Sequence, residues 1–145
     1  MSDSSDRPVI YPAIRYADAH AAIAFLERAF GFRLHAIYES PDGTVAHAEL
    51  ELDGAFVMLG SQKQDFVGTR TPAEVGGVTS TLYLYVPDVD TAHARASAAG
   101  ADIVMPLRKM DYGAREFMAR DPEGHVWSFG DYRPAPEPQA KAQSV

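Results

Sequence analysis

The sequence contains no cysteine, which excludes disulfides, thiolate metal sites and a cysteine nucleophile. Basic residues are fewer than acidic ones: the chain has 13 Lys and Arg and 20 Asp and Glu, which gives a net charge of −7. Nucleic-acid binding depends on neutralising phosphates with Lys and Arg, so this balance argues against a nucleic-acid partner. No apolar run approaches the roughly 20 residues of a membrane span, and the N-terminus has no signal-peptide pattern. We therefore expect a cytoplasmic protein with neither nucleic acid nor membrane as a partner.

The remaining composition is that of one soluble domain. A chain of 145 residues with 46% hydrophobic residues can form a sizeable core. Residues 1–7 are polar, and residues 133–145 contain three prolines and few apolar side chains. We expect both ends to be disordered, with one structural domain over residues 8–132.

Residues 111–132 predict a strand, a tight turn and a second strand. Pro122 sets φ at the first corner of the turn, and Gly124 can adopt the positive φ that closes it. Beyond the turn, Trp127 and Phe129 alternate with small or polar residues such as Ser128. One face of this strand must therefore be covered by a helix or a second sheet, while the opposite face has room for a ligand.

The same pattern occurs 70 residues upstream. Residues 52–60 (LDGAFVMLG) align with residues 122–130 (PEGHVWSFG), so that Gly54 matches Gly124. At the same offset, Asp18 and Asp88 each begin an alanine-rich run. The sequence therefore predicts two copies of one supersecondary unit.

Each copy has the pattern of a β-α-β-β-β module, one over residues 8–60 and the other over residues 81–132. The expected strands are residues 9–15, 32–39, 45–51, 55–59, 81–86, 103–107, 115–120 and 125–130, and the expected helices begin at Asp18 and Asp88 and end at Gly31 and Gly100. Residues 61–80 break the pattern and are either a plain linker or a loop over a site. The predicted fold class is α+β, with two curved mixed sheets forming a cup and the helices on its outside.

Four motifs in this order resemble a known family. They are Ala17-Asp18 followed by AIAFLERAFGF, the hairpin LDGAFVMLG, the segment VPDVDTAHARASAAGA and the segment YGAREFMARDPEGHVWSF. Residues 9–132 are similar to the vicinal oxygen chelate superfamily, which comprises glyoxalases, bleomycin-resistance proteins and dioxygenases. The resemblance implies paired β-α-β-β-β modules. It leaves the function open, because the superfamily includes lyases, isomerases, ring-cleaving dioxygenases and non-catalytic drug-binding proteins.

The metal enzymes of that superfamily carry one ligand on each of four central strands. The resemblance places these positions at Tyr11, Met58, Thr81 and Ser128, and the internal offset relates Tyr11 to Thr81 and Met58 to Ser128. Thioether and hydroxyl groups are not usual ligands of zinc, nickel or iron. We therefore expect no metal and no other cofactor, as in the metal-free bleomycin-resistance-like branch.

Strand alternation places aromatic, methionine and a few polar side chains on one face of the cup. The candidate ligand-binding residues are Tyr11, Arg15, Phe56, Met58, Thr81, Tyr83 and Tyr85, joined by Glu116, Met118 and Ser128 if the family's facing of the last hairpin applies. Such a lining suits a small apolar or aromatic ligand. The alternative is that these aromatic side chains fill a closed core or a dimer contact. Tyr112 precedes the seventh strand and either closes over a ligand or packs on the rim.

Three side chains are candidates for acid–base chemistry. His47 and Glu49 face the open side if Ala46, Ala48 and Leu50 form the helix-packing face of the third strand, and Glu116 lies in the last hairpin. A one-residue bulge would reverse the third strand, so its facing stays open. The other histidines have weaker claims: His35 on an edge strand, His20 and His93 on helix surfaces in solvent, and His125 hydrogen-bonded within its turn.

The sequence is compatible with three classes of function. The first is a protein similar to bleomycin-resistance proteins that binds and sequesters a small molecule. The second is a lyase, isomerase or dioxygenase-type enzyme that uses His47 or Glu116 as a general base. The third is a dimeric scaffold with an empty groove. The resemblance also implies a homodimer, because chains of this fold commonly complete the cup with a partner.

Overall fold

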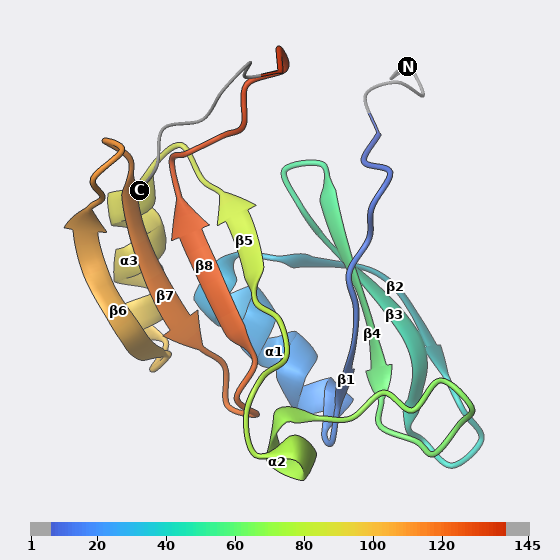
Figure 1. The fold of residues 1–145 in the computed structure, drawn as a ribbon. Coiled ribbons are helices and arrows are strands. Elements are labelled where there is room, and N and C mark those ends of the chain that lie inside the picture. The colour runs from blue at the N-terminus through green and yellow to red at the C-terminus, as the bar shows by residue number, and fades with distance from the viewer. Residues whose placement is uncertain (1–6, 139–145) are drawn as a thin grey trace.

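The structure, a computed structural model, describes residues 7–138, which form two four-stranded mixed sheets and three helices (Figure 1). The elements are β1 (Ala13–Tyr16), α1 (Ala19–Phe30), β2 (Arg33–Glu39), β3 (Val45–Leu52), β4 (Ala55–Ser61), α2 (Pro72–Val75), β5 (Leu82–Tyr85), α3 (Val89–Ala98), β6 (Asp102–Lys109), β7 (Arg115–Arg120) and β8 (Val126–Gly130). The predicted α+β class is confirmed. The disorder expected for residues 1–6 and 139–145 lies outside the described residues. None of the described helices is long and apolar enough to cross a membrane.

Both sheets have the same topology. The strand orders are β1-β4-β3-β2 and β5-β8-β7-β6, and in each sheet the first and last strands of the module pair in parallel. Ala13 pairs with Met58 in the first sheet, and Tyr83 pairs with Ser128 in the second. Both residues of the second pair lie 70 positions after those of the first. Residues related by the 70-residue repeat therefore pair in the same way in the two sheets.

Helix α1 covers the aromatic face of β8, for which the sequence predicted a covering helix or sheet. The Asp18 carboxylate accepts a hydrogen bond from the Ala21 backbone N–H, and Gly31 ends the helix in the left-handed region at φ 82°. At its last turn Phe30 packs on Trp127 and Phe129 of the second sheet, with ring centroids 5.5 and 4.8 Å apart. The core is therefore shared between the two modules.

The backbones of the two modules meet through their helices. Helix α1 packs on α3, whereas within residues 7–138 no Cα atom of a first-sheet strand lies within 8 Å of a Cα atom of a second-sheet strand. Figure 1 shows β1 and β5 apart, with α1 behind and between them. The open faces of the two sheets consequently do not form one common groove within a single chain.

A buried aspartate also connects the modules. The Tyr16 hydroxyl donates to Asp121 Oδ2 over 2.6 Å, and the Trp127 indole N–H donates to the same oxygen over 3.1 Å. Asp121 Oδ1 accepts the backbone N–H groups of Glu123 and His125. The predicted turn is thus built around a carboxylate that β1 of the other module also contacts.

Three local expectations are wrong in detail. Strand β1 begins at Ala13 and not at residue 9, because Pro8 and Pro12 have no N–H to donate to a ladder. In β3 the core side chain is Val45 and not Ala46, since the β2–β3 register shifts at Glu39. His93 is not in open solvent, because its ring packs edge-on against Phe117 at 5.0 Å.

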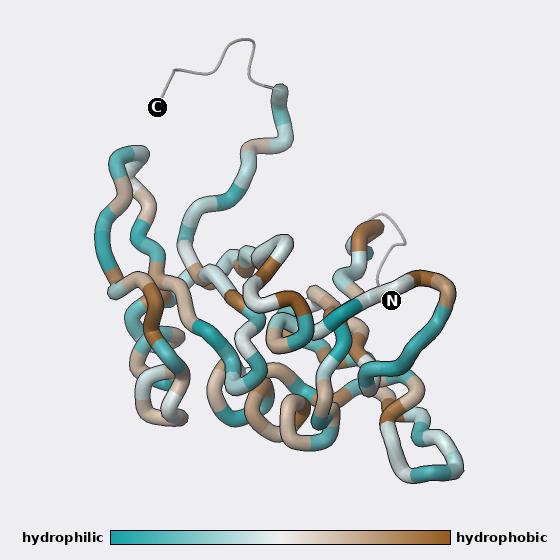
Figure 2. The backbone as a smooth tube through the Cα atoms, turned by 60° about the horizontal axis from the view of Figure 1, so that its bottom comes forward, coloured by the Kyte–Doolittle hydropathy of each residue, from teal (hydrophilic) through white to brown (hydrophobic). Residues whose placement is uncertain are grey.

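The segment between the modules contains a short helix. Thr71 and Glu74 form a reciprocal capping box at the N-terminus of α2. The preceding loop has two exposed apolar residues at its tip, Phe66 and Val67. The hydropathy colouring in Figure 2 shows this tip among otherwise hydrophilic loop residues.

Candidate ligand-binding site

The open face of the first sheet forms a cavity. Its volume is about 690 Å³, and its wall combines aromatic, thioether and charged groups contributed by Arg7, Pro8, Tyr11, His35, Glu49, Gly54, Phe56 and Met58. The Phe56 ring lies between Tyr11, at a centroid distance of 6.3 Å, and His35, at 5.1 Å. A cavity of this size can hold a small organic molecule. The structure therefore brings four of the predicted ligand-binding residues, Tyr11, Glu49, Phe56 and Met58, into one lining.

Strand β3 directs its polar side chains into this open face. Glu49 lines the cavity, and His47 Nε2 lies 3.0 Å from Glu49 Oε2, while Ala48 and Leu50 are buried in the core. His35 Nε2 is 3.9 Å from the other oxygen of Glu49. The Tyr38 ring stacks on His47 at 6.0 Å. The carboxylate of Glu49 thus lies between two imidazoles, an arrangement that can hold or move a proton.

The second sheet presents a different set of side chains. Tyr83 and Tyr85 of β5 are about 40% exposed, while Glu116 of β7 is only 8% exposed. The Tyr112 hydroxyl donates a short hydrogen bond to Glu116 Oε2, and the Tyr83 hydroxyl donates to the Tyr132 carbonyl over 2.7 Å. Met118 and Ser128 are paired on the adjacent strands β7 and β8. Tyr112 therefore packs over Glu116 at the end of this face.

Gly130 allows two of these side chains to converge. A Cβ at Gly130 would lie 2.5 Å from the Glu116 Cγ and 2.8 Å from the Tyr83 hydroxyl oxygen. Only glycine leaves room for both groups over the same strand. The carboxylate and the phenol are consequently held close together.

The carboxylate changes the acidity of both phenols. The hydrogen bond to Glu116 raises the pKa of Tyr112 to about 12, with burial as the second cause. Burial raises the pKa of Tyr83 above its ordinary value, and the charge of Glu116 raises it further. Both hydroxyls therefore stay protonated at neutral pH and act as hydrogen-bond donors.

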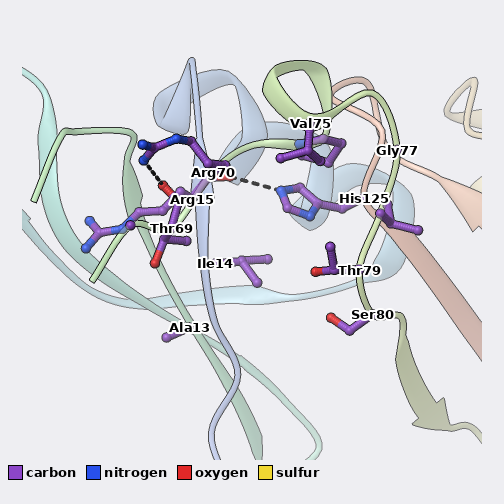
Figure 3. A pocket seen from close by; sticks show the side chains of 13 residues that line it. Ala13, Ile14, Arg15, Thr69, Arg70, Val75, Gly77, Thr79, Ser80 and His125 are labelled. Carbon is purple, nitrogen blue, oxygen red and sulfur yellow. Dashed lines mark hydrogen bonds between the residues drawn. The ribbon is translucent and has the colours of Figure 1, made fainter. Parts of the chain in front are cut away.

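Arg15 contributes to a separate cavity and not to the aromatic face. Its guanidinium lies 3.4 Å from the Asp65 carboxylate, and it lines a smaller space of about 360 Å³ beside Arg70 and His125. Figure 3 shows the two guanidinium groups at one end of this space and Thr79 and Ser80 at the other. His125 Nε2 bonds the Arg15 carbonyl over 2.9 Å, so the ring links the modules and does not bond only within its own turn. Arg15 is thus removed from the predicted lining.

The residues that the family resemblance assigns to a metal site do not suit a divalent ion. They are Tyr11, Met58, Thr81 and Ser128, whose phenol, thioether and hydroxyl groups are poor ligands for such an ion. Within residues 7–138, no three His, Cys, Asp or Glu side chains converge as a metal ion would require. We derive no step through a metal.

Sequence reasoning missed two residues of the open faces. His35 lies in the cavity because β2 pairs with β3 in a register that brings it near Glu49, which edge-strand alternation alone did not reveal. Tyr132 follows β8 and packs its ring on Tyr112 at 5.6 Å. Its position two residues after the strand was the only available signal.

The fold and the order of its modules are those of a known family. A family model described as Glyoxalase/Bleomycin resistance protein/Dioxygenase superfamily matches residues 9–129. The chain belongs to this superfamily. It is also 37% identical over 125 residues to uncharacterized proteins of Mycobacterium bovis and Mycobacterium tuberculosis, covering 85% of this chain and 82% and 74% of those proteins.

Solved structures show the same fold. TioX from Micromonospora sp. ML1 is 34% identical, with a TM-score of 0.67 over 83% of this chain and 95% of that chain. UcmS2 is 20% identical, with a TM-score of 0.68 over 84% of this chain and 96% of that chain. A glyoxalase I mutant from Zea mays is 19% identical, with a TM-score of 0.65 over 88% of this chain and 46% of that chain. The last two likenesses concern the fold alone.

Proposed function

We propose that the protein binds a small apolar or aromatic molecule without a metal, in the manner of a sequestering bleomycin-resistance-like protein. The observation that supports this proposal is the set of residues at the positions implied by the resemblance: Tyr11, Met58, Thr81 and Ser128 carry phenol, thioether and hydroxyl groups in place of the imidazoles and carboxylates of the superfamily's metal enzymes. Such groups bind flat molecules by stacking and by burial of apolar area. A few polar groups, Glu116 and His47 among them, orient the ligand by hydrogen bonds.

The proposal includes a homodimer. In one chain the two open faces are separate, and each leaves large aromatic side chains exposed. A second copy that brings its first sheet against the second sheet of this chain would close a cup over both. Light scattering at micromolar concentration is expected to give twice the 15.8 kDa of one chain. A clean monomer under these conditions contradicts this part of the proposal.

Binding is tested with 1-methylnaphthalene, a flat neutral probe, by saturation-transfer NMR and calorimetry. Stacking contributes about 0.5–1.5 kcal/mol beyond area burial, and further apolar area is lost with the ring. Tyr83→Ala is therefore expected to weaken binding about tenfold or more, since 1.4 kcal/mol corresponds to one decade. Phe66→Ala is the matched control, because that ring is fully exposed on the loop before α2. Unchanged affinity in both Tyr83→Ala and Met118→Ala means that the ligand binds elsewhere.

A second candidate is an enzyme of the same superfamily that uses His47 or Glu116 as general base. The His47–Glu49 contact of 3.0 Å favours it, because a carboxylate beside an imidazole orients the ring for proton transfer. Glu116→Gln and His47→Gln distinguish the two candidates. A sequestering protein loses only modest affinity for a neutral ligand, whereas an enzyme loses turnover and keeps binding. Elemental analysis showing stoichiometric zinc, nickel, manganese or iron would overturn the metal-free basis of both.

A further inference from the structure

Glu116 is a buried carboxylate without a cation. The other buried carboxylate of the described residues, Asp121, accepts hydrogen bonds from Tyr16, Trp127 and two backbone N–H groups and is satisfied by them. Glu116 is 8% exposed, and among the described residues its hydrogen-bond partner is the neutral Tyr112 hydroxyl, with no ion pair. Burying a charge without an opposite charge is costly. A site that maintains such a group has a use for a cation.

The second carboxylate oxygen is accessible from the open face. The hydrogen bond from Tyr112 occupies Oε2, and Oε1 has no partner within residues 7–138. No side-chain nitrogen or oxygen in this part of the chain is both fully buried and unpartnered. Oε1 of Glu116 therefore keeps access to solvent and is free to accept a bond from a ligand.

Four tyrosines gather near this oxygen. Tyr112 bonds the carboxylate, Tyr83 converges with it over Gly130, Tyr132 packs its ring on Tyr112, and Tyr85 follows Tyr83 on the same face of β5. Their exposed fractions lie between 40% and 55%. The negative faces of tyrosine rings attract organic cations. We call these four rings with Glu116 the tyrosine–carboxylate cluster.

The chain itself already places a cation on one of these rings. The guanidinium carbon of Arg133 lies 4.3 Å from the centroid of Tyr85, well within cation–π distance. Arg133 follows β8 on an exposed segment, so a ligand can displace it. This cation–π contact shows that a tyrosine of the cluster can bind a positively charged group.

We propose that the tyrosine–carboxylate cluster binds the positively charged group of the ligand, a protonated amine, a quaternary ammonium or an amidinium carried on a flat aromatic frame. This inference rests on the proposed function, because it names the charge of the molecule that the groove binds. The cation meets Glu116 Oε1 and the faces of the tyrosine rings, while the aromatic frame lies over Met118. The net charge of −7 adds attraction at long range.

The test compares two probes of the same shape, 1-methylquinolinium and 1-methylnaphthalene, which differ by a ring N⁺ in place of carbon. The charge of the first is independent of pH, so calorimetry at low salt measures the cation preference directly. The wild-type protein is expected to bind the cation at least tenfold more tightly than the neutral probe. Glu116→Gln is expected to abolish this preference and to leave the neutral probe's affinity within about threefold.

Two further variants keep the test decisive. Glu27→Gln removes the same charge from the exposed side of α1 and is expected to leave the cation preference intact. Arg133→Ala, on an exposed segment, frees the Tyr85 face and is expected to raise the cation affinity several-fold without changing the neutral probe. Its result does not depend on the folding of a buried-site variant.

The outcomes separate this inference from the proposed function. Equal binding of the two probes, a preference for the neutral probe, or a preference that persists in Glu116→Gln overturns the inference and leaves the proposed function standing. Binding of neither probe up to the solubility limit of 1-methylnaphthalene overturns both. An Arg133→Ala effect no larger than that of Glu27→Gln shows that Tyr85 does not contribute to cation binding and overturns the cluster as drawn.

Discussion

The hydrogen bond between Tyr16 and Asp121 is expected to be among the larger single contributions to stability. Tyr16 is 1% exposed, and its hydroxyl donates over 2.6 Å to a carboxylate that is itself 4% exposed. Burial raises the pKa of Tyr16, and the charge of Asp121 raises it further, so the hydroxyl remains a donor at any pH the fold tolerates. The bond joins β1 of one module to the β7–β8 turn of the other.

Tyr16→Phe removes this bond and keeps the ring, which packs edge-on against His125 at 4.8 Å. Asp121 retains the Trp127 indole N–H and two backbone N–H groups, so the loss is that of one hydrogen bond to a charged acceptor. We expect the free energy of unfolding to fall by about 1.5–3 kcal/mol. At an m-value of about 2 kcal/mol/M, the urea midpoint would fall by about 1 M.

Urea unfolding at one fixed protein concentration measures this change, with the fluorescence of the single tryptophan, Trp127, as the signal. Tyr38→Phe is the control, because Tyr38 is 61% exposed and its hydroxyl has no hydrogen-bond partner among the described residues. That control is expected to stay within about 0.5 kcal/mol of the wild type. A Tyr16→Phe protein equally close to the wild type, with an unchanged m-value, would refute the importance of this bond.

Three further predictions concern the second sheet and the metal. Gly130→Ala is expected to displace Glu116 and Tyr83, since the new Cβ would lie 2.5 and 2.8 Å from their atoms, and to cost about 1–3 kcal/mol in urea unfolding; wild-type stability and probe binding would contradict this. Tyr112 has a folded-state pKa of about 12, above its ordinary 10.0, so its contribution to stability is full below pH 10 and lost as the pH rises toward 12. Absorbance at 295 nm follows all seven tyrosines, and Tyr16, Tyr83 and Tyr112 have raised pKa values. Glu116→Gln is expected to move part of the late titration to lower pH, and an unchanged titration curve would disprove the coupling. Dialysis against EDTA is expected to leave thermal unfolding and probe binding unchanged, and a lower melting temperature would indicate a structural metal.

Local signals in the sequence were sufficient for the modules. Asp18 and Gly31 set the ends of α1 through capping and positive φ, which depend on residues within one or two turns. The 70-residue repeat predicted two copies of one supersecondary unit, and the structure shows that the copies share a register, Ala13 with Met58 and Tyr83 with Ser128. The family motifs then supplied the paired arrangement of the modules.

The composition of the site depended on contacts between residues far apart in the sequence. Arg15 alternates with Tyr11 along the chain, yet its guanidinium contacts Asp65, 50 residues away, and lines a cavity that Tyr11, Phe56 and Met58 do not line. His47 and Glu49 face the open side, as their alternation with Ala48 and Leu50 indicated, whereas the burial of Val45 in place of Ala46 depended on the β2–β3 register shift at Glu39, which no single-strand pattern contains.

The sequence by itself thus determined the fold class, the two modules and the residue types on each open strand face. Tertiary structure decided that the open faces of the two predicted sheets do not share one groove within a chain, because α1 packs its Phe30 against Trp127 between the modules. It also decided that Glu116 is buried with one oxygen bonded to Tyr112 and the other free, since that depends on where the β6–β7 loop places the Tyr112 hydroxyl. Alternation along a strand specifies a face, and only packing specifies what that face meets.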